Sequence, residues 1–384
     1  MPPIYLDHNA TTPLDRQVAE AMRACDVEGY LNPASQHQFG QRARRRLELA
    51  RESIARLLGA RTDSHRADQV LFTSGGTEAN NLALLGLAGN PPGHVIVTAI
   101  EHPSVLGAAE HLERRGFAVD RLPVDEAGVA RVADLPGLIR SDTRVVSLML
   151  VNNETGVLQP VREAAMCCQA ARVPFHTDAV QGVGKLPVNF AELGATALTA
   201  TAHKLGGPRG VGVLVLAHGA PLQAIHFGGF QQAGLRPGTE SVTLAVGMQT
   251  ALENVIAQPE VPARLELLRD RFEQALLSQL PDVIVNGGGA ARAPHTSNLS
   301  FLGVDRQMLV VALDLAGVAC STGSACASGS SDPSHVLAAM GASDPVLRSA
   351  LRFSFGVSTS VPEVDEACER IVKSINDLRS RKSS

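Results

Sequence analysis

Short runs of apolar, often β-branched residues alternate along the chain with longer stretches in which apolar residues recur at helical spacing. The runs at 70–73, 94–97, 145–150 and 173–177 each lead into polar residues or glycine. This alternation, from about residue 15 to residue 255, predicts a mostly parallel sheet covered by helices on both faces. In such α/β folds the loops after the strands commonly carry the functional groups.

A proline-bearing connector interrupts the pattern at 258–262 and is followed by a charged amphipathic helix predicted over 263–280. We place a domain boundary there. The large domain is expected to cover residues 15–258, and a smaller α+β domain is expected to cover residues 259–384. We assign the N-terminal segment, residues 1–14, to the small domain.

The composition is that of an ordinary globular protein, with 45% hydrophobic and 19% charged residues, and it excludes a disordered or fibrous class. A net charge of −4 gives no excess of positive charge of the kind that binds nucleic acid. The sequence has no run of about 18 apolar residues that could span a membrane, and its first residues do not resemble a signal peptide. We therefore expect a cytoplasmic protein that binds neither nucleic acid nor membrane.

Six cysteines in 384 residues are too few for a disulfide scaffold, and a cytoplasmic compartment would keep them reduced. No two of them form a Cys-x-x-Cys pair, so we expect no metal site. Each thiol is then either a small packing group or a nucleophile, and its surroundings must decide which.

Lys204 is an unusual lysine, because small residues and glycines surround it at 201–210 and an apolar run follows at 211–216. Burial would lower the pKa of its amine and make it a nucleophile toward an aldehyde, as in enzymes that hold pyridoxal 5'-phosphate (PLP). An ordinary lysine in a glycine-rich loop between strands is the alternative, and this segment alone does not decide between the two.

A PLP site would also need an anion cradle, a carboxylate at the pyridine nitrogen and a group against the ring face. Gly76 and Thr77 lie in a strand-to-helix turn whose free amides and helix dipole suit a phosphate. Asp178 ends the strand at 173–177, where a pyridinium would be a suitable partner for its carboxylate. The alternatives are a glycine pair kept for steric reasons and an aspartate that caps the next turn.

Three further polar residues follow predicted strands. His102 could stack on the ring and move a proton, although a histidine after a strand is more often a structural hydrogen-bonding residue. Gln181 could donate to the phenolic oxygen of PLP, and Asn153 could reach the cofactor or the substrate. A surface glutamine and an asparagine-rich turn are the structural alternatives.

Together these motifs resemble fold-type I PLP enzymes and, more narrowly, cysteine desulfurases of the NifS and IscS kind. The resemblance spans nearly the whole chain. Its matching segments are 5–12, 32–35, 73–80, 101–103, 152–156, 176–181, 202–204 and 235–240. It implies an α/β fold with a large PLP-binding domain around a mostly parallel seven-stranded sheet, and a smaller α+β domain.

The resemblance also implies a role for each matching residue. Lys204 would bind PLP as a Schiff base, Asp178 would pair with the pyridine nitrogen, and His102 would stack on the ring and shuttle protons. The other cofactor contacts would come from Gly76, Thr77, Asn153, Gln181, Thr201 and His203. Thr239 would reach the phosphate bound in the other subunit, which implies a homodimer.

Cys326 lies in a run of small residues without apolar period, which predicts an exposed, mobile loop at about 319–332. A free cysteine in such a loop can act as a nucleophile, although most cysteines are buried as small hydrophobic residues. By the family resemblance Cys326 is the cysteine that carries the persulfide, in a loop of the long type. Cys320 is expected to be structural.

The reaction implied by the resemblance converts L-cysteine to L-alanine and leaves the sulfur on Cys326, for delivery to an iron–sulfur scaffold protein or a thiolation acceptor. Arg352 matches the arginine that binds the substrate carboxylate, a role suited to its bidentate guanidinium, and Asn153 would share in substrate binding. Phe230 and Gln232 depart from the family pattern near the expected dimer-side wall of the site, where they could alter substrate preference. Two alternatives stay open: another PLP reaction, such as selenocysteine lysis, cysteine sulfinate lysis or transamination, and a non-catalytic sulfur-relay scaffold.

Overall fold

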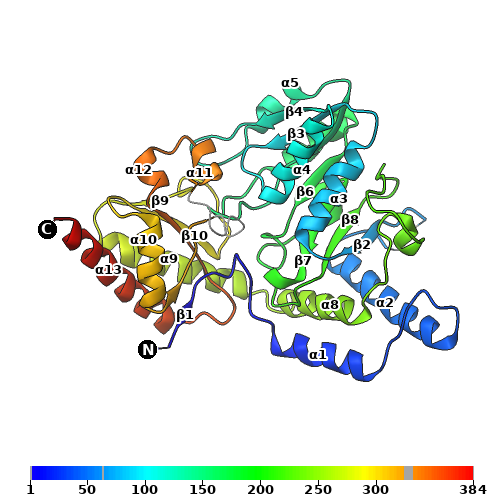
Figure 1. Ribbon diagram of the computed structural model, residues 1–384, viewed down its shortest axis with the longest axis horizontal. Coiled ribbons are helices and arrows are strands. Elements are labelled where there is room, and N and C mark those ends of the chain that lie inside the picture. The colour runs from blue at the N-terminus through cyan, green and yellow to red at the C-terminus, as the bar shows by residue number, and fades with distance from the viewer. Residues whose placement is uncertain (1, 63–64, 324–331, 384) are drawn as a thin grey trace.

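A seven-stranded sheet forms the centre of the larger part of the molecule (Figure 1). The computed structural model describes residues 2–62, 65–323 and 332–383. The strands are β2 (Gln69–Thr73), β3 (His94–Thr98), β4 (Ala118–Leu122), β5 (Thr143–Ser147), β6 (Phe175–Asp178), β7 (Ala197–Thr201) and β8 (Gly212–Leu216). Their order is β2-β8-β7-β6-β5-β3-β4, and only β8 runs antiparallel to its neighbours. The predicted α/β class with a mostly parallel sheet is confirmed.

Helices cover both faces of this sheet, as its alternating side chains require. Leu71 and Leu214 pack beneath one layer of helices, while Phe72 and Val213, their neighbours along the strands, pack beneath the other. The first layer consists of α3 (Gly76–Ala88) and α4 (Pro103–Arg114). The second consists of α1 (Arg16–Val27), α2 (Gln38–Leu57), α6 (Val161–Ala171) and α8 (Val242–Ile256).

The predicted strand at 145–150 is shorter in the structure, where β5 ends at Ser147. Beyond Ser147 the backbone still bonds to β6, because Leu148 and Leu150 donate to the carbonyls of His176 and Asp178. On the other side of the chain, the backbone N–H of Met149 donates to the side chain of Glu101, at 2.8 Å. Glu101 is fully buried, and burial raises the pKa of its carboxyl group to about 8. A buried acid thus bonds to one side of the segment that leads to Asn153.

A second core lies in the smaller part and joins Ile4 and Leu6 to apolar residues between 261 and 375. A three-stranded antiparallel sheet in the order β12-β10-β9 packs there against helices. Its elements are α9 (Val261–Gln279), β9 (Val283–Val285), β10 (Thr296–Phe301), α10 (Arg306–Leu315), β12 (Ala350–Ser354) and α13 (Val361–Ser383). The N-terminal strand β1 (Ile4–Tyr5) pairs in parallel with β11 (Val318–Ala319). The domain boundary near residue 258 stays a prediction.

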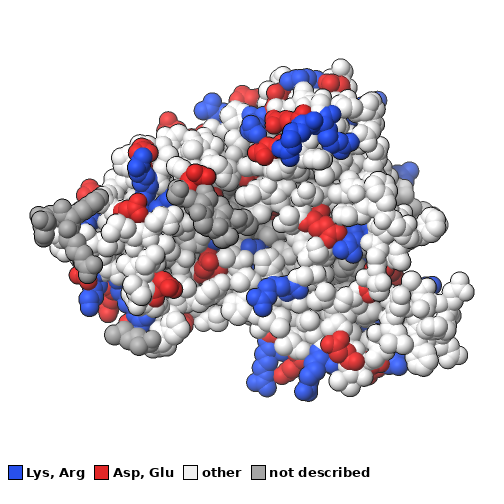
Figure 2. Space-filling model, in the orientation of Figure 1, with Lys and Arg blue, Asp and Glu red and all other residues white. Residues whose placement is uncertain are grey.

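Short helical segments connect these elements. The α-helical ones are α5 (Leu135–Leu138), α7 (Phe190–Leu193), α11 (His335–Ala339) and α12 (Asp344–Leu347), and the 3-10 turns are η1 (Val132–Asp134), η2 (Ala202–Lys204) and η3 (Gln231–Gly234). Acidic and basic side chains are interspersed over the face seen in Figure 2. In the part of the chain that the structure describes, no helix is both long and apolar enough to cross a bilayer.

Gly356 lies directly against the ring of His8, and this contact predicts a sharp steric effect. A Cβ at position 356 would come within 2.1 Å of His8 Cε1, and His8 is only 2% exposed. Because the buried ring has little room to move, we expect Gly356→Ala to lower the free energy of unfolding by about 1–3 kcal/mol, measured by urea denaturation. Gly107→Ala is the matched control: it adds a methyl group to α4 where no atom lies within 4 Å, and should leave stability unchanged or raise it.

Candidate active site

The predicted site residues gather around one cavity of about 250 Å³ beside the carboxyl ends of the parallel strands. Parallel strands bring together the loops that follow them, although these loops lie far apart in the sequence. Among the residues that line the cavity are Gly76, Thr77, His102, Asn153, Asp178, Gln181, Thr201, His203 and Lys204. Arg352 and Thr239 are not among its lining residues.

Lys204 ends the 3-10 turn η2, which directly follows β7. Its side chain is half-buried, less enclosed than the sequence suggested, and its amine donates to the backbone carbonyls of Asn9 and Ala10, the latter at 2.7 Å. Two glycines shape the chain beyond it: Gly206 has a φ of +75°, and a Cβ on Gly207 would come within 2.7 Å of Ala202. The glycine-rich sequence therefore serves the turn that presents the lysine to the cavity.

Asp178 is buried at the end of β6 and uses both carboxylate oxygens. Oδ1 accepts the backbone N–H of Val180 at 2.9 Å, as in the capping alternative considered from the sequence. Oδ2 accepts the side-chain amide of Asn80 at 2.6 Å. The carboxylate is thus fixed by two donors on the wall of the cavity, and it places a negative charge there.

A hydrogen-bonded chain connects this carboxylate to His102. Asn80 also donates to Ser104 Oγ at 2.9 Å, and Ser104 Oγ lies 2.7 Å from His102 Nδ1. His102 caps α4, and its Nδ1 accepts the backbone N–H of Ser104 at 3.1 Å. Nδ1 is therefore an acceptor, which places the proton of the neutral ring on Nε2.

Asn80 and Ser104 were not predicted from the sequence as site residues. One signal for Asn80 was present: it lies three residues after Thr77 on α3, so both side chains lie on the same face of the helix. Ser104 carries no comparable signal, because its role depends on a contact between α3 and α4. Both residues act by holding Asp178 and His102 in place.

Two histidines on the cavity wall are neutral at pH 7. Burial holds the pKa of His102 below its ordinary value, although the charge of Asp178 acts in the opposite direction. Burial lowers the pKa of His203 to about 4, and the charges of Lys204 and Lys185 add to that shift. A neutral His102 can accept a proton, and a neutral His203 can still donate one hydrogen bond to an anion.

The amino-terminal end of α3 supplies the features of an anion site. The helix begins at Gly76, and its N-cap residue, Gly75, provides no side-chain cap for the first amides. A Cβ on Gly76 would come within 3.1 Å of Val180 Cγ2, so glycine keeps this end of the cavity open. The helix dipole, the uncapped amides and the Thr77 hydroxyl favour a bound phosphate.

Three buried side-chain oxygens on the cavity wall have no hydrogen-bond partner among the described residues: Asn80 Oδ1, Asn153 Oδ1 and Gln181 Oε1. Buried polar atoms in folded proteins are nearly always paired, so these atoms fit a polar ligand in the cavity. PLP combines an aldehyde, a pyridine nitrogen, a phenolic oxygen and a phosphate. An amine, a buried carboxylate and an uncapped helix end surround the same cavity, and this set of groups fits PLP.

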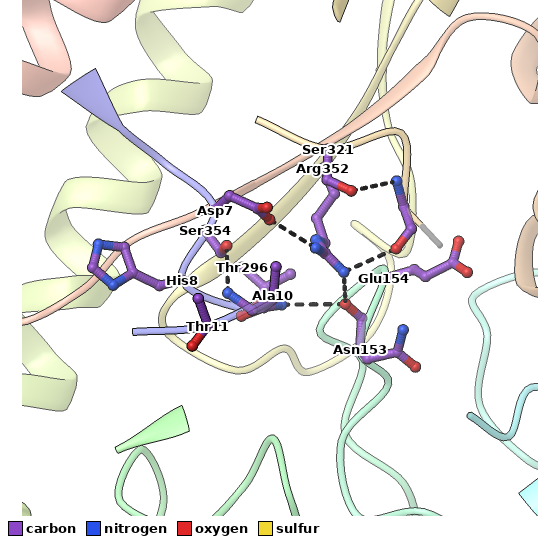
Figure 3. A network of polar contacts seen from close by, with 12 residues as sticks. Asp7, His8, Ala10, Thr11, Asn153, Glu154, Thr296, Ser321, Arg352 and Ser354 are labelled. Carbon is purple, nitrogen blue, oxygen red and sulfur yellow. Dashed lines mark hydrogen bonds and ion pairs between the residues drawn. The ribbon is translucent and has the colours of Figure 1, made fainter. Parts of the chain in front are cut away.

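Arg352 lies beside the cavity and links the two parts of the molecule (Figure 3). Its Nη1 donates to the backbone carbonyls of Asn153 and Gly323, at 3.0 and 2.9 Å, and its Nη2 pairs with Asp7 at 2.8 Å. Its Nε is buried without a partner among the described residues. The sequence analysis did not anticipate the pairing with Asp7, and the predicted contact of Arg352 with a substrate carboxylate stays a prediction.

Cys326 lies outside the described residues, within the segment 324–331. Before that segment, Cys320 is half-buried, and burial raises the pKa of its thiol to about 12, so it stays protonated at neutral pH. After it, Ser334 Oγ donates to the buried carboxylate of Glu154 at 2.5 Å. Glu154 follows Asn153 directly, so the chain beyond 331 is attached to the loop that carries Asn153.

Thr239 is exposed and lies in the segment that follows η3. In the same region Phe230 is 95% exposed, whereas Gln232 bonds to the backbone N–H and carbonyl of Phe72, at 2.6 and 2.9 Å. Gln232 thus lies at the outer edge of β2, the strand that leads into the turn at Gly75 and Gly76. The expected dimer contacts of Thr239, Phe230 and Gln232 stay predictions.

Known proteins resemble this chain over almost all of its length. Residues 4–366 match the family described as aminotransferase class-V. The cysteine desulfurase IscS of Dictyoglomus turgidum is 39% identical over 381 residues, which are 98% of this chain and 95% of that protein. The cysteine desulfurase NifS of Azotobacter vinelandii is 37% identical over 99% of this chain and 94% of that protein. A solved NifS-like protein superposes with a TM-score of 0.90 at 32% identity, covering 98% of this chain and 100% of that one.

Proposed function

Since this chain belongs to the aminotransferase class-V family, and its relatives there are cysteine desulfurases, we propose that it desulfurates L-cysteine with PLP held at Lys204. The observation that carries the proposal is the single cavity lined by Lys204, Asp178 and the amino-terminal end of α3. These groups match the amine, carboxylate and anion cradle that PLP requires. We propose L-cysteine as the substrate because the IscS and NifS relatives are cysteine desulfurases.

Each wall of the cavity would hold one part of the cofactor. When bound, PLP supplies an aldehyde for the Lys204 amine and a conjugated ring that accepts electron density from the substrate. The end of α3 would bind the phosphate together with Thr201 and His203, and Asp178 would keep the pyridine nitrogen protonated. Asn80 contributes indirectly, because its bond to Asp178 holds the carboxylate in place.

Proton movement falls to Lys204 and His102. An amine beside the substrate can remove the α-proton and return it to another atom. His102 is a neutral ring held by Ser104, so it would take up a proton at Nδ1, its acceptor nitrogen, and, once charged, would release one from Nε2. Arg352, with its unpartnered Nε, and Asn153 would orient the substrate carboxylate.

Cys326 would take the sulfur. Its thiolate attacks the sulfur of L-cysteine, an S–S bond forms as the C–S bond breaks, and the substrate carbon keeps the electron pair and gains a proton. The balanced result is L-alanine and a persulfide on Cys326. A low-molecular-weight thiol or an acceptor protein then removes the outer sulfur.

We propose further that the enzyme is a cytoplasmic homodimer. Thr239, which is exposed and does not line the cavity of its own chain, is the residue expected to serve the phosphate site of the second copy. A reducing compartment suits the reaction, because Cys326 must be a free thiol in every cycle. An iron–sulfur scaffold protein is the sulfur acceptor that we propose, on the resemblance to cysteine desulfurases of the NifS and IscS kind.

The deciding experiment measures both products. Purified protein is incubated with L-cysteine and a reductant, and alanine and sulfide are followed for the unaltered enzyme and for Cys326→Ala. We expect the variant to retain the cofactor absorbance and to lose both products by at least about 10²-fold, since no other thiol replaces the nucleophile. Cys320→Ala is the matched control from the same region and should remain active. Undiminished alanine from Cys326→Ala would show a reaction without a persulfide on this residue.

A further inference from the structure

The chain has only four lysines, Lys185, Lys204, Lys373 and Lys382, among a total of 34 lysines and arginines. Two of the four lie together: Lys185 Nζ donates to the backbone carbonyl of Lys204 at 3.0 Å. Arginine carries the positive charge almost everywhere else, and arginine does not lose its proton in proteins. A lysine at position 185 therefore offers an amine that can change its charge, next to the residue proposed to bind PLP.

Lys185 is buried with no acid to balance its charge. Its side chain is 7% exposed, and burial lowers the pKa of its amine to about 7, with the charge of Lys204 adding to the shift. No carboxylate among the described residues contributes to that shift. A buried, unpaired ammonium destabilises a fold, and residues that do so are often found at functional sites.

The titratable groups around Lys185 are mostly basic. Its charge lowers the pKa values of His8, in the N-terminal segment, His203, in the turn after β7, and His295, just before β10. The same cluster includes Lys204, and repulsion between two positive charges acts equally on both. On the solvent side, Asp15 and Arg16 line a second cavity of about 330 Å³ together with Lys185 and Lys204, and both are exposed.

The local backbone holds Lys185 in this position. Gly184 has a φ of +74°, and a Cβ there would come within 2.7 Å of Leu205, the residue after Lys204. The two segments therefore pack without an intervening side chain. The contact that Lys185 makes is with the backbone of η2, at the carbonyl of Lys204.

We propose that Lys185 is a positioning residue for Lys204: its amine fixes the Lys204 carbonyl, and its charge disfavours a proton on the Lys204 nitrogen. This keeps the Lys204 nitrogen reactive at neutral pH. The inference deepens the proposed function and rests on it for its purpose. The coupling between the two lysines can nevertheless be measured in protein that contains no PLP.

Two measurements give the pH at which the Lys204 nitrogen loses its proton. In PLP-loaded protein, this pH is the midpoint of the change in cofactor absorbance. In cofactor-free protein, the rate at which an amine-specific acylating reagent modifies Lys204 is measured at a series of pH values by peptide mass spectrometry. With four lysines in the chain, the labelled peptides are easily assigned.

We expect Lys185→Met to raise both midpoints by about one pH unit, because a neighbouring positive charge is removed. The titration curve of Lys204 against pH should also become narrower and take the shape expected for a single group, since two interacting amines titrate over a wider pH range than one. Lys185→Arg keeps the charge at every pH and should leave the midpoints at or below those of the unaltered protein. Lys373→Met, at an exposed lysine on α13, is the control and should change neither.

Thermal unfolding separates this role from a structural one. Lys185→Met removes an unpaired buried charge and is expected to unfold a few degrees higher at pH 6. In the unaltered protein the destabilisation is complete below pH 7, and it fades as the pH rises toward the ordinary lysine value near 10.5. The advantage of the variant should therefore shrink over that range. A lysine kept for packing or hydrogen bonding would instead make Lys185→Met less stable at every pH.

Unchanged midpoints in Lys185→Met would overturn the inference, whatever its stability. A shifted midpoint in the cofactor-free protein supports it even if PLP proves not to bind at Lys204, so this arm separates failure of the inference from failure of the proposed function. Midpoints in Lys185→Arg that rise as far as in Lys185→Met would also overturn it, because the charge would then have no role.

Discussion

Lys204→Ala is expected to abolish covalent attachment of PLP and to lower alanine formation from L-cysteine by about 10²–10⁴-fold or more, the range for loss of an acid–base group alone. Lys204 is the only lysine among the described residues that line the cavity. Borohydride treatment of the PLP-loaded protein, followed by peptide mass spectrometry, should find the phosphopyridoxyl group on Lys204 and on no other lysine.

Two outcomes make this result informative. Lys204→Ala should keep the fold, because the side chain is only half-buried and the backbone carbonyls of Asn9 and Ala10, which accept from its amine, can bond to water instead. If Lys204→Ala unfolds at the normal temperature but no longer attaches PLP covalently, the substitution has removed a catalytic group and has not disrupted the fold. Label on Lys185 in the unaltered enzyme, by contrast, would contradict the assignment of Lys204 as the cofactor lysine.

Arg352→Ala is expected to be the most destabilising single substitution near the site. The side chain is 2% exposed, pairs with Asp7 and donates to two backbone carbonyls. Removing one partner of a buried ion pair leaves the other charge uncompensated, which costs about 3–5 kcal/mol of unfolding free energy. The KM for L-cysteine should also rise about 10- to 100-fold, equivalent to losing a hydrogen bond of ~1.5–3 kcal/mol to a charged group.

Arg348→Ala is the matched control. Arg348 lies four residues earlier, its side chain is 72% exposed, and its ion pair with Asp344 is exposed as well, so the loss should be below about 0.5 kcal/mol. Asp7→Asn tests the cause, because Arg352→Ala should cost less when Asp7 carries no charge. Equal losses in both backgrounds would show that the ion pair is not the source of the stability.

The sequence was most informative where function depends on local order. Apolar runs ending in polar residues predicted the strands that precede Asn153 and Asp178, because burial on both faces of a parallel sheet leaves a continuous apolar signal. The glycines around Lys204 and Gly76 predicted tight turns for a steric reason that holds in any fold. These positions could be assigned before the structure was known.

Contacts between distant segments could not be predicted in this way. Asn80 is important because it donates to Asp178, which lies 98 residues later in the sequence. Asp7 is important because it accepts from Arg352, which lies 345 residues later. Lys185, in a loop with glycine before it and leucine and proline after it, has the sequence of an exposed turn. Its burial follows only from packing against the segment that contains Lys204.

The N-terminal segment has a consequence for the order of events during synthesis. Its strand β1 pairs with β11, the backbone N–H of Asn9 donates to Ser354 Oγ at 2.8 Å, and Lys204 bonds to the carbonyls of Asn9 and Ala10. Residues 4–9 are thus fixed only after residue 354, which is made much later, has been added. The large sheet can fold while translation continues, but the surroundings of Lys204 are completed only after residue 354 has been made. Nascent chains stalled before residue 350 should therefore lack a finished cofactor pocket.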